Sequence, residues 1–448
     1  MVTSGLLDPL FSTAAADAAM SDHARLQGML DFEAALARAE ARAGVIPAAA
    51  VAAIAAQCDA GLYEMAALAA ATAKAGNPAI PMVKALTAKV AAADSEAARY
   101  VHWGATSQDA MDTGLVLQLR QVLAGIETDL ARLSAALATL AEQHRDTPMV
   151  GRTWLQHALP VTFGLKAAGW LDAVERHRMR LSELKSRLLV LQFGGAAGTL
   201  AALGDKGLAV TAALAEELRL GQPAMPWHGA RDRVAEAATW LGLLTGSLGK
   251  IARDIALMMQ SDVAEAFEPA GEGRGGSSTM PHKRNPVAAA SVLAAAARAP
   301  HLVGTMLSAM VQEHERGLGG WHAEWVALPE LARLAAGALA QTADTIGGLE
   351  TDPGRMRANL DTTRGLIMAE AVMMALGSRI GRLVAHDRVE AACHRAIAEQ
   401  RHLREVLAED EVIAGHLAAG DLERLFDPLN YIGVAPAMVD RVLSARRK

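Results

Sequence analysis

Residues 109–143 read DAMDTGLVLQLRQVLAGIETDLARLSAALATLAEQ, and they are the stretch that says most about the fold. Apolar side chains recur here three and four residues apart, at Val116, Leu119, Leu123, Ile126, Leu130, Leu133, Leu137 and Leu140. This alternation is the heptad seam of a helix that packs on other helices. At about 1.5 Å per residue the helix is on the order of 50 Å long, too long for a small domain to cover. The pattern therefore predicts a bundle of long helices.

Four further stretches carry a similar periodicity. They run over Val161–Leu188, Leu241–Met258, Pro286 to about Leu318, and Leu328–Thr345. Asn285 can cap the third of these helices, which begins at Pro286. Shorter helical patterns lie on both sides, separated by Gly-Pro and Asp-Pro breaks. We expect an all-α protein of three helical domains, residues 1–108, 109–351 and 352–448, with five long helices in the central bundle.

Composition supports this class and excludes others. Of the 448 residues 52% are hydrophobic but only 4% aromatic, which favours tightly packed helices over sheet. The net charge of −6 and the absence of a long basic run argue against nucleic acid as a partner. Cys58 and Cys393 match no metal or redox spacing, as expected in a reducing compartment. No secretory signal and no apolar run of about 20 residues is present, so we expect a cytoplasmic protein without a membrane partner.

Two polar clusters precede long helices. The first is His102-Trp-Gly-Ala-Thr-Ser-Gln-Asp109, continuing to Thr113; Thr106 to Asp109 also has the spacing of a structural capping box. A helix start with free hydroxyls is equally a carboxylate site. The second is Gly151-Arg-Thr-Trp-Leu-Gln-His157, which taken alone reads as a solvated turn.

A third cluster is the glycine-hinged loop Gly275-Gly-Ser-Ser-Thr-Met-Pro-His-Lys-Arg-Asn-Pro286, part of a loop that we place at residues 268–286. Its alternative interpretation is a flexible linker. It lacks the spacing of a phosphate-binding loop, and Gly194-Gly-Ala-Ala-Gly198 lacks the dinucleotide fingerprint. His314 and His322 have no helical ligand spacing. We therefore expect no nucleotide cofactor and no metal.

Taken together, the three clusters resemble the fumarase/aspartase superfamily nearly end to end. Its signature Gly-Ser-Ser-x-Met-Pro-x-Lys-x-Asn is matched at every defined position from Gly276 to Asn285. The resemblance implies a homotetramer built on a twenty-helix core, with active sites shared among three subunits. Outward apolar stripes on the long helices independently favour a homo-oligomer. Residues 25–33, 75–81 and 312–325 further resemble the branch that lactonises a carboxylated muconate during protocatechuate breakdown.

Two departures from the superfamily point to the chemistry. Fumarase and adenylosuccinate lyase carry a histidine at the position of Trp154 and a glutamate at that of Ala290. That histidine protonates an amine or hydroxide leaving group, a contribution of about 10²–10⁴-fold. A carboxylate leaving group departs as a stable anion and needs no acid, and lactone formation is this elimination in reverse. An elimination lyase such as adenylosuccinate lyase, and a non-catalytic helical scaffold, are the alternatives.

The resemblance also assigns the residues. It implies that Ser277 handles the carbon proton, with Lys283 and Asn285 stabilising an aci-carboxylate. It assigns substrate binding to Arg316 and to polar or bulky residues of the three clusters. The cluster residues are His102, Thr106, Ser107, Arg152, Thr153, Trp154, Gln156, His157, Ser278 and Met280.

Overall fold

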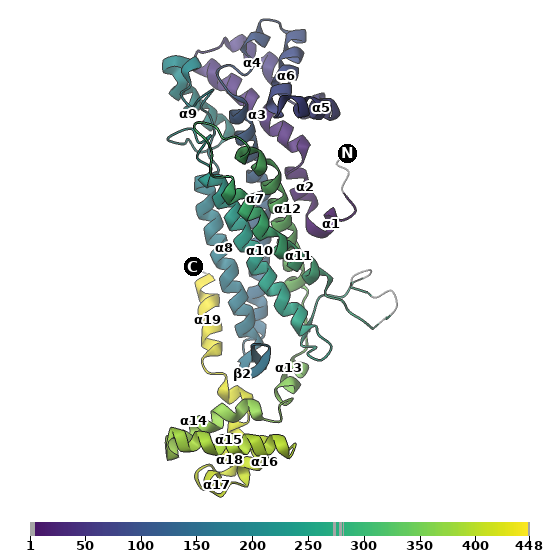
Figure 1. The fold of residues 1–448 in the computed structure, drawn as a ribbon, viewed down its shortest axis with the longest axis vertical. Helices are drawn as coiled ribbons and strands as arrows, with labels where there is room; N and C mark the ends of the chain where they lie inside the picture. Colours follow the sequence, from purple (N-terminus) through teal and green to yellow (C-terminus); the bar gives the residue numbers. More distant parts are fainter. Residues whose placement is uncertain (1–4, 272–274, 277–279, 281, 447–448) are drawn as a thin grey trace. The chain divides into compact units, whose positions relative to one another are not determined.

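The computed structural model describes residues 5–271, 275–276, 280 and 282–446. Helices dominate this part of the chain, and its four strands are short, which confirms the predicted all-α class (Figure 1). Five helices of at least 22 residues match the five predicted rods: α7 (Ser107–Gln143), α8 (Phe163–Leu188), α10 (Asp232–Met258), α11 (Val287–Ser308) and α12 (Gly320–Gly347).

The remaining elements are shorter. Before α7 come α1 (Asp8–Phe11), α2 (Ala14–Ala19), α3 (Asp22–Arg42), α4 (Ala48–Ala55), α5 (Met65–Ala75) and α6 (Ala79–Ala93), and α9 (Gly207–Leu218) precedes α10. After α12 come α13 (Pro353–Leu360), α14 (Ala369–Ile380), α15 (Arg382–Ala398), α16 (Leu403–Ala408), α17 (Glu411–His416), α18 (Ala419–Leu425) and α19 (Ala435–Arg446). The strands are β1 (Pro148–Thr153), β2 (Gln156–Thr162), β3 (Ala266–Phe267) and β4 (Glu350–Thr351).

The heptad seam of α7 is buried as predicted. All eight seam side chains are at most 7% exposed. The corresponding six of α10 are at most 4% exposed: Leu241, Leu244, Leu248, Ile251, Ile255 and Met258. Polar contacts show that α8 and α10 run antiparallel: they meet through Arg187 and Glu236 near one end and through His177 and Ser247 further along. Gly249 gives α11 room to approach α10, because a Cβ there would lie 2.7 Å from that of Ala296. Burying these stripes is what makes the rods stable in water.

Three helix boundaries differ clearly from the prediction. The third rod begins at Asp232 rather than Leu241. The fourth rod ends at Ser308 instead of continuing to about Leu318, since the following segment turns through glycines, with Gly319 at φ 90°. The fifth begins at Gly320 rather than Leu328. The prediction places Pro329 in a first turn, where its missing N–H costs nothing. In the structure Pro329 lies well inside α12.

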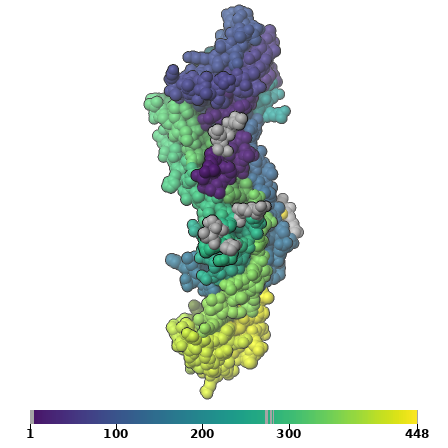
Figure 2. Space-filling view, turned by 90° about the vertical axis from the view of Figure 1, so that its right-hand side faces the viewer, coloured from purple at the N-terminus to yellow at the C-terminus, as the bar shows by residue number. Residues whose placement is uncertain are grey.

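The chain divides into two compact units, each of which takes part of every long helix. Unit 1 comprises Met1–Ala131, His177–Lys250 and Ser291–Thr342; unit 2 comprises Arg132–Arg176, Ile251–Ala290 and Ala343–Lys448. Within unit 2, helices α14 to α18 share a core of their own and form a rounded mass, yellow-green to yellow in Figure 2. The predicted domains 1–108, 109–351 and 352–448 stay a prediction.

Helix α11 is the one described helix long and apolar enough to cross a membrane by length and composition, with a mean hydropathy of 1.3. A core helix of a bundle meets the same criterion. One third of its most apolar window is buried within the chain, and it packs on α10 at Ala296 and Val303. These contacts fit a bundle helix.

Candidate active site

The first predicted cluster forms the start of α7, in unit 1. Asp109 Oδ2 accepts a hydrogen bond from the backbone N–H of Thr106 at 3.1 Å, which is one half of the predicted capping box. The hydroxyl of Thr106 accepts instead from Arg316 Nη1, also at 3.1 Å. Ser107 is the first residue of α7 and is half-buried. A hydroxyl and a guanidinium thus meet at a helix N-terminus, a favourable setting for a carboxylate.

Asp109 is fully buried and ties this cluster to a glycine-rich segment. Its carboxylate accepts from the backbone N–H groups of Gly194 and Gly195 at 3.0 and 2.9 Å. His228 Nε2 lies 2.7 Å from the same carboxylate. A Cβ at Gly194 would be only 2.9 Å from His228 Cε1, so a larger residue would separate these groups. The glycine-rich segment, which lacks a dinucleotide fingerprint, serves to hold the start of α7.

A buried ionic network lies behind the same helix start. Arg231 is 2% exposed and donates to Asp112 Oδ2 at 2.7 Å and to Glu324 Oε1 at 3.0 Å. Trp321 Nε1 donates to the other oxygen of Asp112 at 3.0 Å. Burial alone would lower the pKa of Arg231, but the two carboxylates outweigh it and raise this pKa. The network joins α7 and α12 to the residue that directly precedes α10, all within unit 1. No sequence spacing predicts it.

The two arginines predicted to bind carboxylates differ in their partners. Arg152, in unit 2, donates from both Nη atoms to the fully buried Glu265, each at 2.8 Å. Arg316 donates to Thr106 and to the carbonyl of Ala196 at 3.0 Å, and within the described residues no carboxylate pairs with it. Its positive charge is therefore not compensated there. This difference favours Arg316 over Arg152 for capturing a substrate carboxylate.

The second predicted cluster is a β-hairpin in unit 2: its exposed turn agrees with the solvated turn that the composition alone indicates, and its two strands were not predicted. β1 pairs with β2 in antiparallel register, and the connection is Trp154-Leu155. Both residues have left-handed backbones, φ 53° and 65°, as a two-residue hairpin turn of type I′ requires. Asn-Gly is the usual sequence there, and bulky residues at positive φ mark functional sites. Trp154 is 97% and Leu155 73% exposed, and the flanking Thr153 and Gln156 are exposed too.

His157 lies at the start of β2, beside the exposed tip. Its Nδ1 is buried and has no hydrogen-bond partner among the described residues. Burial lowers the pKa of His157, and the charge of Arg152 lowers it further. The imidazole is therefore neutral near pH 7 and can either donate or accept a proton.

The third cluster, also in unit 2, is described only in part. Ser277 and Ser278 lie outside the described residues, while Met280 is 42% exposed and Lys283 is exposed. Asn285 is bonded to the glycines at the other end of the segment: its N–H donates to the carbonyl of Gly275 at 2.8 Å and its side-chain amide to that of Gly276 at 3.3 Å. The side chain predicted to contact an aci-carboxylate thus closes the loop base in this structure.

Two further side chains fix this loop and were missed from sequence. Glu268 is buried and accepts from two N–H groups in the first turn of α11, at 3.1 and 2.8 Å, so it caps the helix where Asn285 was predicted to. Arg284 donates to Glu350 at 2.8 Å and lies over the ring of Phe267 at 4.8 Å. Both contacts join segments far apart in sequence, where no spacing rule applies.

His102 is the last of the predicted site residues to be placed in the structure. It has φ 58°, and its Nδ1 lies 2.6 Å from Oε1 of Glu33 on α3, within unit 1. The two other histidines near the motifs, His282 and His314, are exposed. Thus His102, Thr106, Ser107 and Arg316 belong to unit 1, and the remaining predicted residues belong to unit 2.

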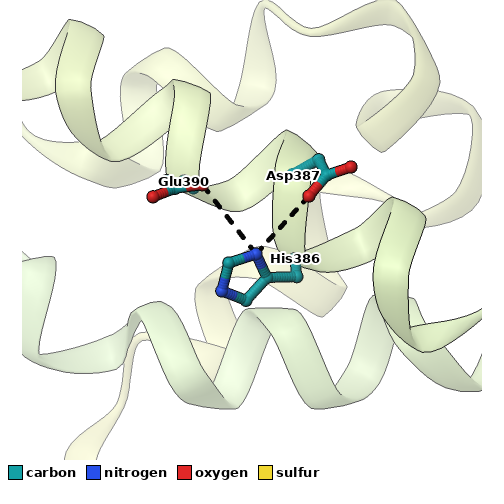
Figure 3. Close-up of side chains that lie close together, drawn as sticks. All are labelled: His386, Asp387 and Glu390. Carbon is teal, nitrogen blue, oxygen red and sulfur yellow. Dashed lines mark ion pairs between the residues drawn. The ribbon is translucent and has the colours of Figure 1, made fainter.

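One described group could hold a metal ion: His386, Asp387 and Glu390 on α15 (Figure 3). The Nδ1 of His386 lies 3.5 Å from the carboxylate of Asp387 and 3.9 Å from that of Glu390. All three side chains are exposed and come from a single helix. None of them belongs to the predicted site, so this group has no part in the chemistry considered below.

Comparisons with known proteins agree on one family. A model described as lyase matches residues 12–300, and one described as adenylosuccinate lyase C-terminus matches residues 365–442. The 3-carboxy-cis,cis-muconate cycloisomerase of Pseudomonas aeruginosa is 62% identical over 439 residues, 98% of this chain and 96% of that protein. The enzyme of that name from Bradyrhizobium diazoefficiens is 60% identical over 442 residues, 99% and 98% of the two chains. A crystal structure of the 3-carboxy-cis,cis-muconate lactonizing enzyme from Pseudomonas putida, 56% identical, superposes with a TM-score of 0.95 over 99% of both chains.

Proposed function

Since this chain belongs to the lyase family, we propose that it is a cofactor-free cycloisomerase that converts 3-carboxy-cis,cis-muconate to 4-carboxymuconolactone. The observation that carries the proposal is the near full-length similarity to relatives named for this reaction, at 51–62% identity. Trp154 at the hairpin tip supports it, because an indole cannot act as the acid that an amine or hydroxide leaving group needs. The product would serve the breakdown of protocatechuate.

The reaction is an intramolecular addition. A substrate carboxylate oxygen forms a bond to one carbon of a conjugated double bond, and the neighbouring carbon gains a proton. Negative charge develops on the carboxylate next to that neighbouring carbon, which becomes an aci-carboxylate until the proton arrives. The starting trianion and one proton therefore give a lactone with two carboxylates, and no group leaves.

We assign the proton transfer to Ser277 and the stabilisation of the aci-carboxylate to Lys283 and Asn285. A hydroxyl can deliver this proton only if its alkoxide is stabilised, which a nearby cation and loop amides can do. Each preorganised donor to an oxyanion contributes about 3–4 kcal/mol to the rate. Exposed Lys283, with a flexible side chain, is suited to this role, and the Asn285 amide would exchange its bond to Gly276 for one to the substrate.

The other substrate carboxylates need separate partners. The uncompensated guanidinium of Arg316, the hydroxyls of Thr106 and Ser107, and the N-terminus of α7 form the best-supported carboxylate site. From unit 2 we assign the exposed hairpin tip to contacts with the substrate: Thr153, Trp154 and Gln156, with His157 beside it and with Ser278 and Met280 from the loop. Arg152 would act mainly through its ion pair with Glu265.

We also propose a cytoplasmic homotetramer with active sites shared among three subunits. Large apolar side chains remain exposed in unit 1 on α10, α11, α12 and the segment between the last two: Leu243, Leu307, Val311, Leu318 and Val326, from 48% to 84% exposed. Apolar surface of this kind is usual where subunits meet. The hairpin tip, almost fully exposed in the single chain, would then meet another subunit.

Two substrates separate the possible functions. The purified protein is mixed with 3-carboxy-cis,cis-muconate and, separately, with adenylosuccinate, and the ultraviolet absorbance of each is followed. We expect loss of the diene absorbance and no cleavage of adenylosuccinate. Adenylosuccinate cleavage without diene loss would replace the proposal by an elimination lyase, an activity that the match of residues 365–442 makes worth measuring. No change with either substrate would leave a non-catalytic scaffold.

A further inference from the structure

Helix α3 carries residues 25–33, which mark the resemblance but have no role in the site so far. Gly28 of α3 meets Gly114 of α7 backbone to backbone. A Cβ at Gly28 would lie 2.9 Å from the carbonyl oxygen of Gly114, and a Cβ at Gly114 would lie 3.0 Å from the carbonyl carbon of Gly28. Any larger residue would push the helices apart. This close crossing fixes where Glu33, little more than one turn further along α3, must lie.

Glu33 lies against the segment that leads into α7. Its side chain is 1% exposed, and its Oε1 is 2.6 Å from Nδ1 of His102. An ionised carboxylate can only accept, so Nδ1 of His102 carries the hydrogen, and Nε2 is the nitrogen that gains or loses a proton. The other oxygen of Glu33 is buried without a partner among the described residues. The imidazole is therefore the group that compensates the charge of Glu33.

A second glutamate on the same face of α3 shows what happens without such a partner. Glu40 is fully buried, and neither of its oxygens has a hydrogen-bond partner among the described residues. Burial, with a smaller repulsion from Glu33, raises the pKa of Glu40 to about 9, so this carboxyl is neutral at pH 7. Of two buried glutamates two helical turns apart, one is uncharged and the other faces an imidazole.

His102 also sits beside the proposed carboxylate site. It precedes Thr106 by one short segment, and Thr106 contacts Arg316. Its backbone is left-handed at φ 58°, a costly conformation that the neighbouring structure must hold in place. The ring is 16% exposed, and no hydrogen-bond partner of Nε2 is found in the part of the chain that the structure describes. One ring nitrogen is thus anchored and the other is available.

We propose that Glu33 is a positioning residue that orients His102 and keeps it as an imidazolium, whose Nε2–H binds one carboxylate of the tricarboxylate substrate. The proposal rests on the function given above and extends it to a specificity device. A substrate with three carboxylates would meet Arg316, the start of α7 and this imidazolium. Glu33 itself would not touch the substrate.

The electrostatics agree with this geometry. Burial alone lowers the pKa of His102, but the charge and hydrogen bond of Glu33 and the charge of Asp109 outweigh it and raise the pKa. Glu33 on α3 and Asp109 on α7 are the charged groups that face the ring. His102 is therefore protonated up to a higher pH than a free histidine. Without Glu33 the burial effect dominates, and the ring would lose its proton at a lower pH.

The test compares the variants Glu33→Gln and His102→Gln with the matched control Glu40→Gln, a buried glutamate on the same helix face without a histidine. For each protein, kcat and KM for 3-carboxy-cis,cis-muconate are measured from pH 5.5 to 8.5. Binding of propane-1,2,3-tricarboxylate is measured by calorimetry at the two ends of this range.

We expect E33Q to raise KM about tenfold at pH 7.5, the scale of one charge-assisted hydrogen bond, with kcat within about threefold of the wild type. At pH 5.5 the ring gains its proton from solvent, so the KM of E33Q should return towards that of the wild type. His102→Gln should raise KM at every pH, and Glu40→Gln should leave KM unchanged. The dissociation constants of the tricarboxylate should follow the same pattern.

Either of two results would overturn the proposal: a KM of E33Q equal to that of the wild type at all pH values, or one that is raised equally at all of them. If E33Q does not fold, an unchanged KM in H102Q would have the same meaning. A wild-type protein that binds the tricarboxylate but leaves the muconate intact would refute the proposed function, and the calorimetry would still decide on the Glu33–His102 pair. Absence of tricarboxylate binding in the wild type, together with no conversion of the muconate, would refute both.

Discussion

The start of α7 and the tip of the β1–β2 hairpin are both proposed to contact substrate, but they are held in opposite ways. At the start of α7 the charged groups Asp109, Asp112 and Arg231 are buried, and each has several hydrogen-bond partners. At the hairpin tip the side chains of Trp154 and Leu155 are mostly exposed to solvent, and both residues have a left-handed backbone. The first region has its partners within one chain, and the second is proposed to contact groups outside it.

Because of this contrast, we expect substitutions at the start of α7 to change stability and substitutions at the hairpin tip or the loop to change activity. Removing one member of a buried ionic network leaves the others unpaired in a medium of low dielectric, so unfolding becomes easier. Removing an exposed side chain of the tip or the loop changes little in the folded chain and acts on whatever that side chain binds. The two regions should therefore respond differently to substitution.

The largest effect is expected for Arg231→Ala. It leaves the buried carboxylates of Asp112 and Glu324 without their cation, and we expect the free energy of unfolding to fall by about 3–5 kcal/mol. Unfolding in urea, followed by circular dichroism, measures this loss. Arg253→Ala, which changes an exposed arginine of α10, is the control and should change stability by less than about 0.5 kcal/mol. Equal effects of the two substitutions would contradict the account.

Lys283→Ala should show the reverse behaviour. Loss of one oxyanion donor should lower kcat about 10²–10³-fold, while the urea midpoint stays that of the wild type because Lys283 is exposed. Rates come from the diene absorbance under saturating substrate. A variant with normal kcat would remove Lys283 from the chemistry, and one with a lower midpoint would show that the loop is a structural element.

Glu40 makes stability depend on pH. The pKa of this carboxyl is about 9 in the folded protein, against an ordinary value of 4.5. Between these values the unfolded chain has released a proton that the folded chain still holds, so stability falls as pH rises, by up to about 1.4 kcal/mol per pH unit. We expect Glu40→Gln to weaken this loss between pH 6 and pH 8 in urea unfolding. Identical pH profiles of the variant and the wild type would contradict the buried neutral state.

The smallest effect concerns the hairpin tip. Leu155→Gly removes the cost of a left-handed backbone in a branched residue, and we expect a gain of about 1 kcal/mol in unfolding free energy. Leu155→Ala keeps a Cβ, and with it the strain, and should give no comparable gain. If both variants lose stability, contacts of the tip outside the single chain outweigh the backbone strain, which would contradict the expected gain and support the proposed contact with another subunit.

Patterns that act within one segment were predictable. The heptad seam located α7 and its buried face, and Thr106 to Asp109 located the helix start, because both depend on residues a few positions apart. Pairs such as Glu33 with His102 and Glu268 with the first turn of α11 were not predictable. They join distant segments, and a single glutamate in a helix looks the same whether it faces solvent or an imidazole.

The roles of Ser277, Lys283 and Asn285 came from the resemblance and remain predictions. The structure adds what the motif could not supply: the loop base closes through Asn285, and Arg152 is already paired with Glu265. The hairpin was missed because Trp154 and Leu155 carry no turn signal, since the usual residues of a type I′ turn are asparagine and glycine.

Conversion of 3-carboxy-cis,cis-muconate in D₂O, with the product identified by NMR, decides between intramolecular addition and elimination. The account predicts a closed lactone that carries one deuteron, in a single stereochemical position, on the methylene carbon next to a carboxylate, because the proton comes from an exchangeable hydroxyl. Cleavage of the carbon skeleton, or a lactone without deuterium, would contradict it.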